Sequence, residues 1–146
     1  MKVDAVVLAG AMNQGALREE SSAEYEALID VAGRPIIDYV LQALLSSQYI
    51  DRVVVVGPDS LEVLINDKRI TVTPHGASLA ENIKLGLAHL SRTEKKVLLV
   101  TADIPLLTAE AVEDFLRRCE REDAAIYYPI VSKEANESAY PGVRRT

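Results

Sequence analysis

Three short apolar runs limit the folds available to this chain. They are Val3–Leu8, Val53–Val56 and Val97–Val100, all mostly aliphatic and none with a regular alternation of polar and apolar residues. Strands that lack this alternation are buried on both faces, which favours a parallel sheet covered by helices. Parallel strands need crossover connections, and segments with helical spacing lie between the runs. We therefore expect an α/β fold, a three-layer α/β/α sandwich with a mostly parallel central sheet.

Two further strands are predicted, at 70–73 and at 124–130, where β-branched and aromatic residues gather. Helices are expected at 35–47, with Pro35 in the first turn, and at about 60–65. The last predicted helix follows Thr108 as its cap and buries a stripe of four residues, which are Val112, Phe115, Leu116 and Cys119.

The helix expected from Leu79 is marked by capping-box spacing at Ser78 and Glu81. The hydroxyl of Ser78 would accept from the third helical amide while Glu81 reaches back. Four apolar residues repeat along this helix at helical spacing, namely Leu79, Ile83, Leu87 and Leu90.

Length, charge and cysteine content exclude several classes of protein. A chain of 146 residues is expected to form a single domain over 1–146, and a net charge of −6 argues against a nucleic-acid or anionic-membrane surface. One cysteine excludes an internal disulfide and a multi-cysteine metal site. No basic segment with a following apolar run opens the chain, and no run approaches the roughly 20 residues of a membrane helix. We therefore expect a cytoplasmic protein with a small-molecule ligand.

The end of the first strand is the first candidate site. Small residues at 9–11 let a ligand approach the backbone beyond a buried strand, although a plain corner between strand and loop has the same composition. The polar segment 14–25 follows, which we interpret as a functional loop or lid, or else as a surface insertion. Arg18 lies in it and could meet a triphosphate, or pair in solvent with Glu19 or Glu20.

Asp103 is the sharpest single candidate, because it follows a buried strand and Pro105 stiffens the chain behind it. A carboxylate there can hold Mg²⁺ against nucleotide phosphates, or it can cap a turn before the Thr108 helix. Gly76–Ser78 with Asn82 offers free N–H groups to a phosphate or a base edge, or simply caps a helix. His75 is a less favoured general base than a structural residue.

The order of these anchors resembles the MobA-like nucleotidyltransferases. Val7–Gly10, a loop, and then Gly33-Arg34-Pro35 resemble the start of that family, Gly76-Ala77-Ser78 with Asn82 its base-contacting segment, and Thr101–Pro105 its metal-binding Asp-x-Pro. The resemblance extends over about 3–115. It implies a nucleotide-diphospho-sugar transferase-like fold.

The resemblance also implies a function for each matched position. Leu8, Ala9, Gly10 and Ala11 would receive the nucleotide through the backbone, and Asp103 would hold Mg²⁺. The base or ribose would lie near three residues, Gly76, Ser78 and Asn82. Arg18 would act on the triphosphate. The implied reaction is attack by a phosphate or hydroxyl on the α-phosphorus of a nucleoside triphosphate, GTP or CTP, with release of pyrophosphate.

This chain departs from the family pattern at three points. Ala11 replaces the second glycine of a pair, and Glu26 stands where a lysine is usual. The family also continues well beyond this length, so we expect 1–146 to be the N-terminal, nucleotide-binding part of a longer protein. Val143–Thr146 is interpreted as the opening of another strand.

Three hypotheses follow from these observations. The first is a nucleotidyltransferase for a small-molecule acceptor, and the second is a catalytically inactive nucleotide-binding or regulatory module of the same fold. The third is an unrelated doubly wound α/β domain, against which no G-x-G-x-x-G follows the first strand.

Overall fold

The computed structural model describes residues 1–90 and 96–143. They fall into two compact units, Met1–Asp114 and Phe115–Thr146. The first unit carries a four-stranded sheet of β1 (Val3–Leu8), β4 (Ile50–Gly57), β5 (Ile70–Pro74) and β6 (Val97–Thr101). Its helices are α1 (Ile36–Ser46), α2 (Ser60–Leu64) and α3 (Leu79–Ala88). Helix α4 (Ala109–Cys119) passes from the first unit into the second.

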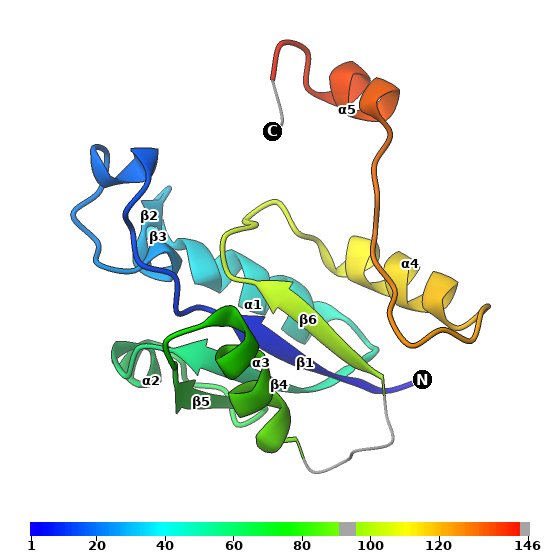
Figure 1. The fold of residues 1–146 in the computed structure, drawn as a ribbon, viewed down its shortest axis with the longest axis horizontal. Helices are drawn as coiled ribbons and strands as arrows, with labels where there is room; N and C mark the ends of the chain where they lie inside the picture. Colours follow the sequence, from blue (N-terminus) through cyan, green and yellow to red (C-terminus); the bar gives the residue numbers. More distant parts are fainter. Residues whose placement is uncertain (91–95, 144–146) are drawn as a thin grey trace. The chain divides into compact units, whose positions relative to one another are not determined.

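All pairings in this sheet are parallel and the strand order is β5-β4-β1-β6. Figure 1 shows α3 on the near face of the sheet and α1 on the far face. The predicted α/β fold with a parallel central sheet is therefore confirmed. Parallel sheets need this double cover because their strands are apolar on both faces.

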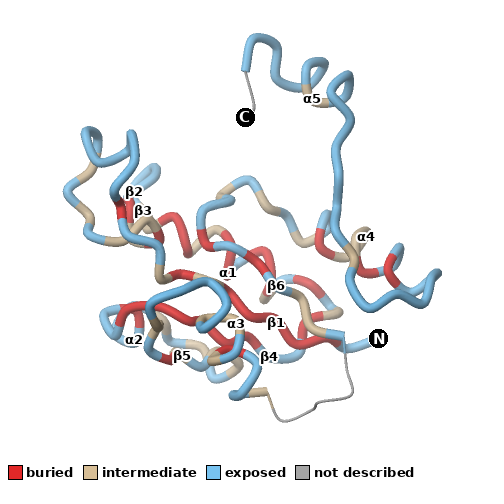
Figure 2. Tube along the Cα trace, viewed as in Figure 1, coloured by how far each residue is buried: buried red, intermediate tan, exposed pale blue. Residues whose placement is uncertain are grey.

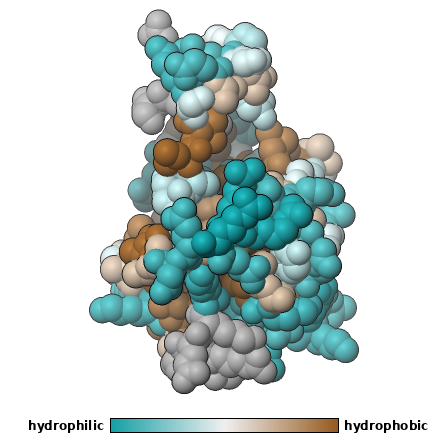
Figure 3. Space-filling view, turned by 90° about the vertical axis from the view of Figure 1, so that its right-hand side faces the viewer, coloured by the Kyte–Doolittle hydropathy of each residue, from teal (hydrophilic) through white to brown (hydrophobic). Residues whose placement is uncertain are grey.

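The core lies on both sides of β1 and β4. Val6, Val54 and Val56 form one buried cluster, against which Leu85 of α3 packs. Other side chains of the same strands, such as Val55, are fully buried, as are Val40 and Leu44 of α1. Figure 2 shows the buried residues concentrated in these strands and in α1. On the face drawn in Figure 3, hydrophobic residues occur in separate groups among hydrophilic ones.

Helix α3 approaches β1 most closely at a glycine, beside the leucine contact made by Leu85. Gly86 is its buried residue, whereas Leu79 and Leu87 are exposed by 65% and 41%. A Cβ on Gly86 would overlap Cγ1 of Val6. The helical spacing of Leu79, Ile83, Leu87 and Leu90 therefore does not mark one buried face. Leu90 packs against the buried cluster, whereas Leu79 and Leu87 are exposed, because the close backbone approach places the smallest residue against β1.

A small hairpin that the sequence did not indicate precedes α1. It consists of β2 (Asp30–Val31) and β3 (Arg34–Pro35), joined by Ala32 and Gly33, both with positive φ. The amide of Gly33 donates to Oδ1 of Asp30 over 2.9 Å. A tight hairpin turn requires positive φ at both central residues, which explains Gly33 but leaves Ala32 strained.

The prediction of a fifth strand at 124–130 is wrong. The structure has irregular chain there, and Ile126 and Ile130 are exposed by 84% and 87%. A strand needs a neighbour to receive its hydrogen bonds, and the described part of the second unit contains no strand. That unit instead contains α5 (Lys133–Ala139), capped by the hydroxyl of Ser132, where a polar tail was expected.

Other local predictions are confirmed. Thr108 Oγ1 accepts from the amide of Ala111 over 3.2 Å at the start of α4, and Leu116 and Cys119 are buried. The strand predicted at the chain end falls mostly on 144–146, outside the described residues. Within the described residues, no helix combines the length and apolarity needed to cross a membrane.

Candidate nucleotide pocket

The carboxyl ends of the four parallel strands lie side by side at one edge of the sheet. Leu8 of β1 lies beside Val56 of β4 and Thr101 of β6, and Val56 lies beside Thr73 of β5. The strand order reverses at β1, because the chain passes first to β4 on one side and later to β6 on the other. In open α/β sheets ligands bind outside the carboxyl ends at such a switch point.

A pocket of about 310 Å³ opens at this position, entirely within the first unit. A volume of that size is at the lower end of small-molecule sites. The lining residues come from four segments of the chain, namely Leu8–Ala11, Glu26–Ala27, Gly76–Leu79 with Asn82, and Thr101–Asp103.

The floor of the pocket is the backbone that leaves β1. Beyond the last strand residue the sheet bonding continues, since the amide of Ala9 donates to Val56 over 2.8 Å and that of Ala102 donates to Leu8 over 3.2 Å. Ala9 is buried, whereas Ala11 is exposed and its methyl group lies at the pocket. The chain is therefore held rigidly up to the point where it can meet a ligand.

One side of the pocket, here called the neutral side, is the start of α3 with Gly76–Leu79 and Asn82. The hydroxyl of Ser78 accepts from the amide of Glu81 over 3.2 Å, as the capping box predicts. The Glu81 carboxylate, however, accepts from the amide of Ala77 over 2.8 Å, one residue before the cap. The capping-box prediction is thus right for Ser78 and displaced by one residue for Glu81.

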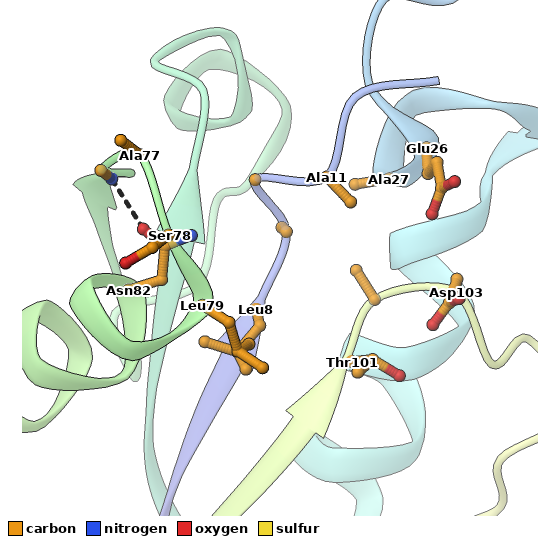
Figure 4. A pocket seen from close by; sticks show the side chains of 14 residues that line it. Leu8, Ala11, Glu26, Ala27, Ala77, Ser78, Leu79, Asn82, Thr101 and Asp103 are labelled. Carbon is orange, nitrogen blue, oxygen red and sulfur yellow. Dashed lines mark hydrogen bonds between the residues drawn. The ribbon is translucent and has the colours of Figure 1, made fainter. Parts of the chain in front are cut away.

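Asn82 is oriented by its own side-chain oxygen. Oδ1 accepts from the amide of Gly76 over 2.6 Å, drawn as the dashed line in Figure 4. The other end of the amide, Nδ2, lies toward the end of β1, because a Cβ on Gly10 would stand 3.3 Å from it. The neutral side therefore offers a fixed N–H donor and the Ser78 hydroxyl, groups that suit a base edge or a ribose.

The opposite side, here called the acidic side, carries Glu26, Thr101 and Asp103. Figure 4 shows both carboxylates across the pocket from Ser78 and Asn82. Mg²⁺ takes oxygen ligands and is usually bound through one or two carboxylates, with water and substrate phosphates completing its shell. These residues fit that donor set. No group of three or more His, Cys, Asp or Glu that could hold a metal occurs within 1–90 and 96–143.

The loop between β1 and the pocket residue Glu26 is held by internal bonds. The buried side chain of Asn13 donates through Nδ2 to the carbonyls of Ser21 and Ala23, over 3.1 and 3.0 Å. Arg18 donates through Nη1 to the carbonyl of Ala23 over 3.1 Å. The segment is thus a bonded loop, and Arg18 is engaged in closing it.

The structure brings together all but one of the predicted site residues. Eight of them line the same pocket, namely Leu8, Ala9, Gly10, Ala11, Gly76, Ser78, Asn82 and Asp103. Arg18 does not line it. Sequence reasoning missed Ala27 and Leu79 as lining residues, although each adjoins a residue that was singled out. It named Ala77, Thr101 and Ala102 only as parts of the Gly76–Ser78 and Thr101–Pro105 motifs. It also missed Asn13, for which a polar residue in a polar loop gave no signal.

Comparison with known proteins gives consistent results. The MobA-like NTP transferase domain matches residues 5–144. A structure described as a hypothetical transferase from Thermus thermophilus is 36% identical with a TM-score of 0.81, over 100% of this chain and 58% of that one. The bifunctional protein GlmU of Parvibaculum lavamentivorans is 32% identical over 101 residues, which are 65% of this chain and 22% of the relative.

More distant structures share the fold. The 4-diphosphocytidyl-2C-methyl-D-erythritol synthase of Anaerococcus prevotii is 16% identical with a TM-score of 0.64, over 92% of this chain and 62% of that one. The chain thus spans less than two thirds of the length of each of these proteins.

The family match over nearly the whole chain agrees with the order of the anchors and with their meeting in one pocket. This chain belongs to the family of the MobA-like NTP transferase domain.

Proposed function

We propose that the pocket binds a nucleoside triphosphate, GTP or CTP, with Mg²⁺, and that the domain serves transfer of the nucleoside monophosphate to a phosphorylated or hydroxyl small-molecule acceptor. The observation that carries this proposal is the meeting of eight anchor residues at the switch point of the sheet. Family membership supports nucleotidyl transfer in general. Similarity to a diphosphocytidyl synthase supports CTP as one of the two nucleotides to test.

The chemistry of the two sides of the pocket supports a placement for each part of the nucleotide. The base and ribose would lie on the neutral side against Asn82 Nδ2 and the Ser78 hydroxyl, and the exposed Leu79 would cover the base. The triphosphate would cross the strand end toward the acidic side, near the backbone of Gly10. Mg²⁺ bound there would neutralise phosphate charge, and Asp103 is the residue proposed to hold it.

The proposed reaction is an in-line displacement. An acceptor oxygen forms a bond to the α-phosphorus, the bond from that phosphorus to the bridging oxygen breaks, and pyrophosphate leaves with the electron pair. A hydroxyl acceptor also releases a proton, whereas a phosphate acceptor attacks with an oxygen that is already ionised. Such a reaction depends on positioning and charge neutralisation more than on covalent catalysis by the protein.

Nucleotide-induced stabilisation tests the binding step. A ligand at 100 times its Kd should add about 2.7 kcal/mol to the free energy of unfolding and raise Tm by several degrees. We expect this rise with GTP or CTP in the presence of Mg²⁺, and a smaller rise with EDTA. If no nucleoside triphosphate raises Tm under either condition, the proposed function is wrong.

Asp103→Asn tests the role of the acidic side. We expect the variant to lose the Mg²⁺-dependent part of the rise in Tm and the release of pyrophosphate with candidate acceptors. Asp51→Asn is the matched control, because Asp51 is an exposed residue near the opposite, amino end of β4. Full Mg²⁺ dependence in Asp103→Asn would exclude the metal role.

A second function is favoured by a specific observation. The lining residues include two carboxylates and, among the residues described, no Lys or Arg, while Arg18 is bonded to its own loop. This arrangement suits an inactive nucleotide-binding module of the same fold. Nucleotide-dependent stabilisation without pyrophosphate release from any acceptor would favour this alternative.

A further inference from the structure

His75 contacts two lining residues of the pocket, Gly10 and Gly76, and also Tyr25, which immediately precedes the lining residue Glu26. It follows β5 directly, and its ring packs edge-on against Tyr25 with ring centroids 5.4 Å apart. Nε2 lies 3.1 Å from the hydroxyl of Tyr25, fifty residues earlier, and Nδ1 lies 3.0 Å from the carbonyl of Gly76. Both ring nitrogens therefore have protein partners.

The partners fix the direction of these bonds in the neutral ring. A carbonyl oxygen can only accept, so Nδ1 carries the hydrogen that it donates to Gly76. Nε2 is then the acceptor, and the hydroxyl of Tyr25 donates to it. The ring thus links the carbonyl of Gly76 to the hydroxyl of Tyr25 through one hydrogen bond at each nitrogen.

The third contact of His75 is with the end of β1. A Cβ placed on Gly10 would stand 2.8 Å from the Cβ of His75 and 2.9 Å from its Cγ, closer than side chains approach. Position 10 needs a glycine because its backbone lies against Cβ and Cγ of His75. His75 therefore lies behind the floor of the pocket, which Gly10 helps to line.

The two bonded partners adjoin residues on opposite sides of the pocket. Tyr25 immediately precedes Glu26 and Ala27, and Gly76 begins the neutral side. Tyr25 also closes the 12–25 loop through its bridge to Met12, and the amide of Glu26 donates to the carbonyl of Ala11 over 3.0 Å. A displacement of His75 would consequently move residues on both the neutral and the acidic side of the pocket.

We propose that His75 is a positioning residue that couples the loop closed by Tyr25 to the turn that opens α3, and so sets the separation of the two sides of the nucleotide pocket. The part of this inference that concerns nucleotide rests on the proposed function. The coupling itself is a property of the protein without ligand and is measured there first.

Hydrogen exchange at single amides tests the coupling. Tyr25→Phe removes only the hydroxyl, and we expect about two- to tenfold faster exchange at the amides of Gly76 and Ala77, the range for loss of one hydrogen bond. These amides are bonded to Asn82 and Glu81, not to Tyr25. His75→Phe should likewise speed exchange on the other side, at Asn13 and Glu26.

Tyr39→Phe is the matched control. Its hydroxyl donates to the carbonyl of Val31 over 2.6 Å, outside the pocket, so the same atom is lost elsewhere in the fold. Coupling would be excluded if Tyr25→Phe left the exchange rates of the Gly76 and Ala77 amides unchanged. An equal rise at Gly76 and Ala77 in Tyr39→Phe would also overturn the proposal, because it would report general loosening. Tyr25→Phe alone decides the question if His75→Phe fails to fold.

Nucleotide affinity gives the second readout. Tyr25→Phe and His75→Phe should each raise the Kd for the Mg²⁺–nucleotide complex about two- to tenfold, and the double variant should be no weaker than the weaker single variant. Additive losses, or unchanged Kd in both single variants, would refute positioning. If the wild-type protein binds no nucleotide, the proposed function fails, while the exchange measurement still decides the coupling.

Discussion

Two carboxylates give the pocket a charge that opposes a triphosphate. Glu26 and Asp103 both lie on the acidic side, and Glu26 is half-buried there. Two unit charges 4 Å apart interact by about 1 kcal/mol in water and about 4 kcal/mol at the effective dielectric of a protein surface. A triphosphate bound as proposed would therefore need cations that offset both its own charge and that of the two side chains. The charge of Glu26 therefore adds to the cation charge that the proposed nucleotide would need beyond an ion held by Asp103.

Glu26→Lys should strengthen nucleotide binding. Replacing a negative by a positive charge beside the phosphates is expected to lower the Kd by about tenfold or more at low salt and to reduce its dependence on Mg²⁺. Calorimetric titration with and without Mg²⁺ measures both effects. Glu24→Lys makes the same charge change at an exposed residue outside the lining. Equal gains in the two variants would show that only the overall charge matters.

At the scale of elements, the contact between α3 and β1 positions the neutral side of the pocket. Because Gly86 has no Cβ, the helix lies so close to β1 that a Cβ there would overlap Val6. Val6 belongs to the buried cluster that Leu85 also contacts. The start of the same helix carries Ser78 and Asn82. The distance of α3 from the sheet therefore also sets where Ser78 and Asn82 lie in the pocket.

Gly86→Ala should destabilise the protein by about 1–3 kcal/mol, the usual cost of overpacking. This is opposite in sign to the roughly 1 kcal/mol that alanine gains over glycine in an exposed helix. Urea unfolding measures the change, and Gly15→Ala is the control, since nothing lies within 4 Å of a Cβ there. A neutral or stabilising Gly86→Ala would mean that α3 can move away from the sheet.

The turn between α2 and β5 supplies a test of pH dependence. The amide of Arg69 donates to Oδ1 of Asp67 over 2.8 Å and its guanidinium lies nearby, which lowers the pKa of the Asp67 carboxyl. A carboxyl with a lowered folded-state pKa stabilises the protein above its unfolded pKa, and this is lost as pH falls through the folded value.

Asp67→Asn should therefore be less stable than the wild type at neutral pH, with the difference narrowing as pH falls below the ordinary aspartate pKa of about 3.9. Denaturant unfolding at a series of pH values measures the two free energies. A difference that stays constant over this range would show that the ionised carboxylate does not provide the stabilisation.

At the scale of the whole molecule, the pocket belongs to one unit and the exposed apolar residues of 126–131 belong to the other. Ile126, Tyr128, Ile130 and Val131 are exposed by 84%, 82%, 87% and 65%. Neighbouring exposed apolar side chains of this kind favour association more than internal stability.

Substitution of Ile126 and Ile130 by Ser tests that view. Because both side chains are exposed, the change in the free energy of unfolding should stay within about 0.5 kcal/mol for each. Nucleotide-induced stabilisation should be unchanged, since no residue of this unit up to 143 lines the pocket. A loss of more than 2 kcal/mol would show that the segment is packed in solution, as the incorrect strand prediction at 124–130 would require.

The amino-acid sequence by itself determined the alternation of buried strands and helices, the cap at Ser78, and the small residues and Asp103 that follow strand ends. These features are local, because each depends on periodicity or on neighbours a few residues away. Tertiary structure alone decided that 124–130 has no partner strand among the described residues, that Gly86 rather than Leu79 or Leu87 faces the sheet, and that Arg18 bonds to its own loop. It also placed Glu26 and Asp103 on one side of the pocket and joined Tyr25 to His75. Those outcomes depend on which distant segments meet, and pairing between distant segments leaves no periodic trace in a single sequence.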